Sequence, residues 1–388
     1  MEDWTDYITT VKELNLYRAP VNYRPLDAVH VEAEGQKYLL LATNNYLGLT
    51  HSLAVKKAAM SAVEQYGTGS GGARLTTGSH PLYEKIEKKI AAFKGTEAAV
   101  VFNTGYMANV GTISAILNKG DVVFSDELNH ASIIDGCRLS KGQTVVYRHA
   151  DMNHLAEVLE NTTCSGRRLI VTDGVFSMDG DIAPLDQIVT LAEQYQAMVM
   201  VDDAHAVGVL GRGGRGTVDY FGLKDRVQIQ VGTLSKSLAA EGGYVAGSQA
   251  LIHYLINKAR SFIFSTALSP ATIGAAYAAL EELEKNPGLV DQLLMNADYV
   301  RTALVDAGLQ VDGRVTPILP IMVGEAGIAV KMAEELKKAG LIVSAIRPPT
   351  VMPGASRLRL TVSAAHQYDD LKRAVNIIIA VSKKMNLI

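Results

Sequence analysis

Short apolar runs separated by helical stretches occupy residues 80 to 250, and they constrain the fold of this chain more than any other feature. The runs lie at residues 98–102, 122–124, 144–147, 169–172, 198–201 and 227–231. A strand that is apolar on both sides is typical of a parallel sheet with helices on both faces, because neither face then meets water. The pattern therefore predicts an α/β fold built on a mostly parallel sheet.

Polar and glycine residues follow most of these runs directly. In parallel sheets, ligands bind beyond the carboxyl ends of the strands, so these residues are predicted to share one site. In chain order they are Gly105 and Tyr106, His130, Asp173 and Ser177, Asp202, Asp203 and His205, and Thr233, Ser235 and Lys236.

Lys236 is the most informative of these residues. A charged lysine is costly to place at the end of a buried strand. The position is explained if the amine must be neutral and nucleophilic, as in Schiff-base chemistry. A lysine in an exposed loop is the alternative for any single lysine, but the neighbouring strand ends favour a site.

The predicted set matches three parts of pyridoxal 5′-phosphate. Gly105 opens a helix whose first N–H groups could bind a phosphate, Asp202 could pair with the ring nitrogen, and Lys236 could bind the aldehyde. Successive side chains of a strand point to opposite sides, so only one of Asp202 and Asp203 should face the site. We assign Asp202 as the residue that faces the ring nitrogen. A metal ion held by Asp202, Asp203 and His205 is the weaker alternative, because further ligands at a recognisable spacing are missing.

The bulk properties narrow the class of protein. The chain has 388 residues, a net charge of −3 and two cysteines, Cys137 and Cys164, in no CxxC motif. This charge gives no reason to expect nucleic acid or a membrane surface as partner, and the cysteine usage fits a reducing compartment. Neither a signal peptide nor an apolar run near the ~20 residues of a membrane span is visible. We therefore expect a cytoplasmic protein.

The pattern divides the chain into three parts. Residues 1–45 are predicted to form a helix and an extended segment, residues 46–285 a large α/β domain, and residues 286–388 a smaller α+β domain. Near the end of the chain, Arg357 and Arg359 alternate with leucines and should share one face of a strand. A guanidinium that faces a cleft could bind a carboxylate through two hydrogen bonds.

The sequence resembles the α-oxoamine synthases, a family of fold-type I pyridoxal-phosphate enzymes, over nearly its whole length. The shared motifs lie at residues 67–72 (GTGSGG), 126–132 (DELNHAS), 174–180 (GVFSMDG), 201–205 (VDDAH) and 233–236 (TLSK). The resemblance implies a mostly parallel seven-stranded sheet with helices on both faces, a smaller C-terminal α+β domain and a short N-terminal segment. It also implies homodimers with active sites at the interface.

The resemblance implies roles for individual residues. The catalytic residues would be Lys236 as the Schiff-base lysine, Asp202 as the partner of the ring nitrogen, His130 stacked on the ring, and His205. Further cofactor contacts would be Ser177 and His205 to the phenolic oxygen, Gly105, Tyr106 and Thr233 to the phosphate, and Thr266 to the phosphate of the neighbouring subunit. Substrate contacts would be Arg359 and Asn44 to the amino-acid carboxylate, and Thr350 and Arg18 to the acyl group.

The implied reaction is the decarboxylative condensation of L-alanine with pimeloyl-CoA, or with a pimeloyl carrier protein, to 8-amino-7-oxononanoate in biotin biosynthesis. Lys236 would move the α-proton, and His130 would serve as an acid toward the thioester oxygen. Condensation of glycine with acetyl-CoA is the nearest alternative, and an aminotransferase is a further one. Ala204 and residues 347–350 favour the pimeloyl substrate, whereas Ala206 and Val207 favour the acetyl substrate.

Several positions depart from the usual pattern of the family. Asp173 stands where glutamate is usual, Ser235 where glycine is usual, and Ala239 and Ala240 where a glycine pair is usual. Asn45 replaces a common aspartate. Met352 and Pro353 stand where the family usually has a proline followed by a small residue. These departures leave the core chemistry intact and bear on the choice of substrate.

Overall fold

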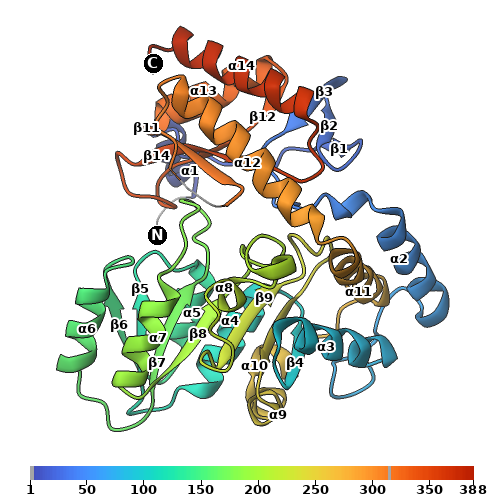
Figure 1. Ribbon diagram of the computed structural model, residues 1–388, viewed down its shortest axis with the longest axis vertical. Helices are drawn as coiled ribbons and strands as arrows, with labels where there is room; N and C mark the ends of the chain where they lie inside the picture. The colour runs from blue at the N-terminus through green and yellow to red at the C-terminus, as the bar shows by residue number, and fades with distance from the viewer. Residues whose placement is uncertain (1–3, 313–315) are drawn as a thin grey trace. The chain divides into compact units, whose positions relative to one another are not determined.

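The computed structural model describes residues 4–312 and 316–388 (Figure 1). Its contacts divide the chain into two compact units. The large unit comprises Leu49–Ser177 and Ile182–Val290. The small unit comprises the described residues of Met1–Gly48, Met178–Asp181 and Asp291–Ile388. The three domains expected from the sequence, with boundaries near residues 45 and 285, remain a prediction.

A seven-stranded sheet forms the centre of the large unit, in the order β4-β10-β9-β8-β7-β5-β6 (Figure 1). Its strands are β4 (Ala98–Phe102), β5 (Val122–Asp126), β6 (Gln143–Tyr147), β7 (Arg168–Asp173), β8 (Ala197–Asp202), β9 (Ile229–Thr233) and β10 (Gly243–Gly247). Neighbouring strands from β6 to β9 pair in parallel, whereas β10 runs antiparallel to both β4 and β9. The mostly parallel seven-stranded sheet is therefore confirmed, and each of the six apolar runs forms a strand.

Both faces of this sheet are covered, as the apolar runs predicted. Alternate residues of β5 enter two separate cores: Val123 packs with Ile113 and Ile133, whereas Phe124 packs with Leu155 and Ile188. The first core involves α4 (Gly105–Ile116), α5 (Ala131–Leu139), α9 (Gln249–Lys258) and α10 (Arg260–Ile263). The second involves α6 (Met152–Asn161), α7 (Leu185–Gln194) and α8 (Thr217–Tyr220). Continuous apolar strands are the direct consequence of this double burial.

The remaining helices of the large unit lie near the edge formed by β4. They are α2 (Leu53–Tyr66), α3 (Pro81–Lys94) and α11 (Pro270–Lys285), with short 3₁₀ turns at Leu49–His51 and Arg212–Gly214. Helix α11 packs against α2 and α3, and α3 packs against β4.

The small unit contains two small sheets. One joins β1 (Arg24–Pro25), β2 (His30–Ala33), β3 (Gln36–Leu40) and β12 (Leu341–Ile342), and the other joins β11 (Ile318–Gly324), β14 (Ser356–Thr361) and β13 (Ser344–Ile346). Helices α13 (Ala326–Lys338) and α14 (Tyr368–Lys384) bury their apolar faces in a core shared with these strands. Helix α12 (Gly288–Asp306) begins at the boundary between the units, and α1 (Trp4–Glu13) is the helix predicted at the N-terminus. Within the described ranges, every helix is too short or too polar to cross a membrane.

Candidate active site

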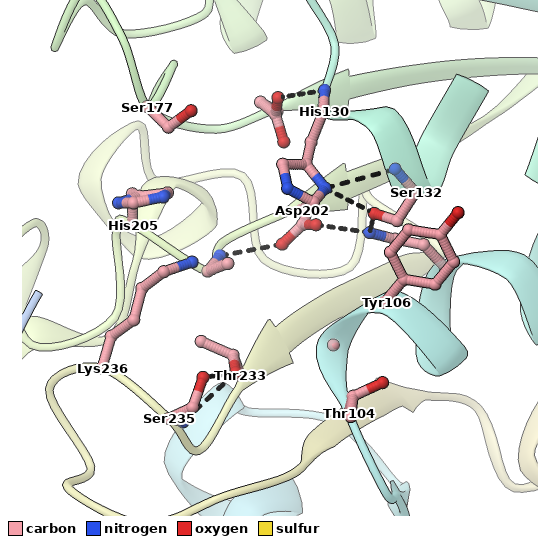
Figure 2. Close-up of a pocket in the computed structure, with 14 residues that line it drawn as sticks. Thr104, Tyr106, His130, Ser132, Ser177, Asp202, His205, Thr233, Ser235 and Lys236 are labelled. Atoms are coloured by element: carbon pink, nitrogen blue, oxygen red, sulfur yellow. Dashed lines mark hydrogen bonds between the residues drawn. The ribbon is translucent and has the colours of Figure 1, made fainter. Parts of the chain in front are cut away.

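A cavity of about 210 Å³ lies in the large unit at the carboxyl ends of the central strands (Figure 2). It is lined by every residue predicted to be catalytic and by all predicted cofactor contacts except Thr266. These residues are Gly105, Tyr106, His130, Ser177, Asp202, His205, Thr233 and Lys236. The strand-end pattern therefore located a real pocket.

Asp202 ends β8 and holds a buried carboxylate at the floor of the pocket. Its Oδ1 accepts a hydrogen bond from the Ala204 backbone N–H at 2.8 Å, and its Oδ2 accepts one from Asn109 Nδ2 at 2.6 Å. The neighbouring Asp203 is directed elsewhere, because its carboxylate pairs with Lys94 at 2.7 Å. Of the two aspartates, Asp202 lines the cavity, and its role there stays a prediction.

The start of α4 borders the pocket and is suited to an anion. Thr104 caps the helix by accepting a hydrogen bond from the Met107 N–H at 3.0 Å, and the first N–H groups of a helix lack intrahelical partners. The adjacent strand β10 approaches so closely that a Cβ at Gly243 would lie 2.6 Å from the Gly105 Cα. Glycine at position 243 therefore keeps β10 close to this helix start.

Thr233 and Ser235 border the same end of the pocket. The Thr233 hydroxyl donates to the Gly242 carbonyl at 2.8 Å, so the 2.6 Å contact between the Thr233 and Ser235 oxygens requires Ser235 to donate. Two hydroxyls beside a helix N-terminus suit a phosphate group.

His130 lies where β5 passes into α5, and its ring lines the open pocket, where the residue is exposed to solvent (Figure 2). Its backbone N–H donates to Asp173 Oδ2 at 2.8 Å, and its Nδ1 lies 2.7 Å from Ser132 Oγ. The protein atoms around the ring lower the pKa of His130 by partial desolvation, even though the residue borders the open pocket; the Asp202 carboxylate opposes this effect and Lys236 adds to it. His130 is therefore neutral near pH 7.

Asp173 occupies the position on β7 that pairs in register with Asp202 on β8. Its side chain is buried, and burial together with the Asp202 charge raises the pKa of Asp173 well above its usual value. Two carboxyl groups this close disfavour ionisation of both at once, so the neighbouring carboxylate adds to the effect of burial on Asp173.

Lys236 extends its amino group into the pocket, toward the side on which Asp202 and His205 lie (Figure 2). Ser177 lines the same cavity from the loop after β7. The pocket thus brings together a primary amine, a carboxyl group, two imidazoles and the start of a helix. This donor set fits an aromatic aldehyde that carries a phosphate and a basic ring nitrogen.

The other predicted contacts lie outside this cavity. Thr266 is exposed, and its backbone carbonyl accepts a hydrogen bond from Asn103 Nδ2. In the small unit, both terminal nitrogens of Arg359 lie 3.2 Å from Asn44 Oδ1, and Arg18 Nη2 lies 3.5 Å from Thr350 Oγ1. The four predicted substrate residues therefore form two contacting pairs, and their roles stay predictions.

Several residues of the pocket had no predicted role. They are Thr104, Asn109, Ser132, Asp173, Ala204 and Ser235. Asn109 carried the clearest signal, because an amide side chain inside the mostly apolar helix 108–117 must find a partner when buried.

The chain matches the family model described as aminotransferase class I and II over residues 36–378. It is 51% identical over 358 residues to the 8-amino-7-oxononanoate synthase of Lysinibacillus sphaericus, covering 92% of each chain. It is 47% identical over 392 residues to 8-amino-7-oxononanoate synthase 2 of Bacillus subtilis (strain 168), covering 100% of both. A solved structure of SPT with a PLP internal aldimine matches with a TM-score of 0.95 at 30% identity, covering 99% of this chain and 98% of the other.

Proposed function

Because the chain belongs to the aminotransferase class I and II family, we propose that it condenses L-alanine with a pimeloyl thioester to form 8-amino-7-oxononanoate, carbon dioxide and the free thiol. This is a step of biotin biosynthesis. The relatives that match from end to end carry this activity in their names. The observation that carries the proposal is the placement of Lys236, Asp202 and His130 around one cavity at the ends of the central strands.

The enzyme uses pyridoxal 5′-phosphate, which supplies an electron sink for the bond broken at the amino-acid α-carbon. Asp202 is suited to the ring nitrogen, since two N–H donors fix the orientation of its carboxylate in the pocket. Gly105, Tyr106 and Thr233 would hold the phosphate at the start of α4. Lys236 would hold the aldehyde carbon.

The side chains of this chain then divide the work of the reaction. The Lys236 amine takes the α-proton of alanine and later returns a proton to the same carbon. Asp202, paired with the ring nitrogen, would favour electron withdrawal from the α-carbon. His130 faces the thioester and donates a hydrogen bond to its carbonyl oxygen as the new carbon–carbon bond forms.

Arg359 would bind the alanine carboxylate. Its guanidinium is buried and contacts the neutral oxygens of Asn44 and Tyr46, at 3.2 and 3.4 Å. The nearby Arg357 pairs instead with the Asp179 carboxylate. A guanidinium can bind a carboxylate through two hydrogen bonds, which is the role proposed for Arg359.

Thr350 and Arg18 would contact the acyl substrate. We further propose a cytoplasmic homodimer in which Thr266 reaches the phosphate in the neighbouring subunit. Sedimentation of the purified enzyme across a range of concentrations tests the dimer directly. A monomer that retains full activity at all concentrations would contradict this assembly.

The test is an absorbance spectrum of the purified protein followed by substrate additions. We expect the visible band of a lysine-bound cofactor, lost in Lys236→Ala. We also expect thiol release with L-alanine and pimeloyl-CoA, but not with glycine and acetyl-CoA. The reverse substrate preference would assign the enzyme to the acetyl-transferring branch of the family, and the absence of the visible band would refute the cofactor assignment.

A further inference from the structure

A chain of hydrogen bonds joins two functional side chains through two residues that have no assigned role. Asn109 on α4 donates from Nδ2 to Asp202 Oδ2 at 2.6 Å and to Ser132 Oγ at 2.9 Å. Ser132 on α5 in turn lies 2.7 Å from His130 Nδ1 (Figure 2). Asn109 and Ser132 are both completely buried. The chain therefore runs from the Asp202 carboxylate to the His130 imidazole through two side chains that are shielded from solvent.

The direction of each bond follows from the chemistry of its end groups. The Asp202 carboxylate can only accept, so the NH₂ group of Asn109 must face it. The second N–H of this group donates to Ser132 Oγ, which leaves the hydroxyl proton of Ser132 for His130 Nδ1. The Ser132 backbone N–H, which can only donate, also points at His130 Nδ1 at 3.3 Å.

Two independent donors thus meet the same ring nitrogen of His130. Nδ1 must be an acceptor, and the single proton of a neutral imidazole must then lie on Nε2. Figure 2 shows this second nitrogen on the pocket side of the ring, away from Ser132. The lowered pKa of His130, caused mainly by burial, agrees with a neutral ring.

We propose that Asn109 and Ser132 are positioning residues that hold His130 as the neutral imidazole with its proton on Nε2. His130 then presents an N–H to the pocket and acts as a hydrogen-bond donor to the thioester oxygen, not as a base. This inference rests on the proposed function for the identity of the oxygen. A fixed donor of this kind lowers the barrier because it needs no reorientation when negative charge develops.

The two residues differ in what they contact, and this difference makes the proposal testable. Ser132 bonds to His130 and Asn109, whereas Asn109 also bonds directly to Asp202. Loss of the Ser132 hydroxyl should therefore affect the step that uses His130. Loss of the Asn109 amide should affect that step and the chemistry at the α-carbon, which depends on Asp202.

The first experiment compares two reactions of the holoenzyme with Ser132→Ala. We expect thiol release from pimeloyl-CoA with L-alanine to fall by about 10- to 100-fold, the order seen when one oxyanion donor is removed. Exchange of the alanine α-proton in D₂O, measured without a thioester, should stay within about twofold because it requires Lys236 and Asp202. Ser132→Thr, which keeps the hydroxyl, should restore thiol release. Equal losses in both reactions, or no loss in either, would overturn the proposal.

A double-mutant cycle with His130→Asn separates positioning from general damage. If Ser132 acts through His130, Ser132→Ala should cause no further loss of thiol release in the His130→Asn background. A purely structural role predicts that the two losses multiply. Melting temperatures of all four proteins identify any variant that is poorly folded, and such a variant is replaced by Ser132→Cys.

The proton position is measured directly by ¹⁵N NMR of histidine-labelled holoenzyme, with His130 assigned by its loss in His130→Asn. We expect Nδ1 to be unprotonated and Nε2 to be protonated at pH 7.5. The opposite tautomer, or a doubly protonated ring, contradicts the proposal whatever the substrate is. If the wild type shows the expected tautomer but releases no thiol, the proposed function fails and the positioning role stands.

Discussion

Asp173 and Asp202 are equivalent in position, at the ends of neighbouring strands, but differ in their surroundings. Asp202 receives two N–H donors, whereas burial and the Asp202 charge raise the pKa of Asp173. We expect Asp173→Asn to keep condensation activity within about threefold, since an amide resembles a protonated carboxyl in shape. Asp202→Asn should lose at least about 100-fold, because it removes the charge beside the ring nitrogen. Steady-state thiol release from both variants is the measurement.

The same pair predicts a pH effect on stability. A carboxyl whose pKa is higher in the folded than in the unfolded protein destabilises the fold once the pH exceeds its unfolded pKa. Asp173→Asn should therefore raise the urea midpoint at pH 7.5 relative to wild type, and this gain should shrink below pH 4. A gain that is unchanged between these pH values would mean that the Asp173 carboxyl is not the cause.

Ala239 is strained at the turn that follows Lys236. Its φ of 52° lies in the left-handed region, which costs an L-residue about 1–2 kcal/mol, and its N–H donates to the Lys236 carbonyl at 3.1 Å. Ala239→Gly should raise the free energy of unfolding by about 0.5–1 kcal/mol, since glycine relieves the strain but gains entropy in the unfolded chain. Ala240→Gly is the matched control and should lower it. Urea unfolding that ranks the two variants the other way contradicts this reading.

The site residues visible in the sequence were those at strand ends. Lys236 and Asp202 stand where an apolar run gives way to polar residues, so their place in the fold could be inferred from their place in the chain. Asn109 and Ser132 lie within helices. Asn109 bonds to Asp202, which is 93 residues away in the sequence, whereas Ser132 bonds to His130, only 2 residues away. Helix periodicity says which face is buried, but not which distant group a buried amide meets.

At the scale of elements, continuous apolar runs predicted the parallel strands because double burial leaves a strong pattern. Strand β10 has a weaker sequence pattern, because it begins and ends with glycine. A glycine has no side chain that would indicate which face of the strand is buried. The pairing of β12 with β3 could not be predicted from local sequence, because the paired residues Leu341 and Leu39 lie far apart in the chain. Such pairings depend on the completed core.

The buried ion pair of Lys94 and Asp203 fixes α3 to the segment after β8. Its Nζ–Oδ2 distance is 2.7 Å, and the two side chains are 1% and 0% exposed. Lys94→Met should cost about 3–5 kcal/mol of unfolding free energy, because it leaves the Asp203 charge buried without its partner. Weaker retention of the cofactor should accompany this loss, since Asp203 adjoins Asp202.

Lys88→Met is the control for this prediction. Lys88 lies on the same helix and pairs with Glu84, but both side chains are largely exposed. Exposed pairs contribute little, so its melting temperature should stay close to that of the wild type. If both variants melt alike, the Lys94 pair is not an anchor of the fold.

At the scale of the whole molecule, the two units should differ in their response to acid. His366 is buried in the small unit, where its Nδ1 accepts from the Ser363 N–H at 2.9 Å and its Nε2 donates to the Leu40 carbonyl at 3.1 Å. Burial is the main reason that the pKa of His366 is lowered to about 4, and nearby His30 also lowers it. The two hydrogen bonds and the Asp370 charge act in the opposite direction and offset part of this effect. Its neutral form is therefore part of the folded structure.

The sign of the effect follows from proton binding. Between pH 6.5 and about 4 the unfolded chain binds a proton at His366 that the folded chain does not, so stability falls as the pH falls through this window. The loss of unfolding free energy should approach about 3 kcal/mol near the lower pH limit of this window. His366→Gln should be less stable at pH 7.5 but should show a shallower slope of unfolding free energy against pH. His253→Gln, at an exposed position of the large unit, should keep the wild-type slope.

This titration should loosen the small unit before the large one, because local opening draws on the interactions of each unit separately. Hydrogen exchange of α14 and β14 should accelerate between pH 6.5 and 4.5. Cys137, buried in the large unit, should stay protected from thiol reagents over the same range. Simultaneous exposure of Cys137 and the small unit would mean that the chain unfolds as one cooperative body. Exposure of the small unit alone would mean that the site around Lys236 persists after residues such as Arg359 have lost their fixed positions.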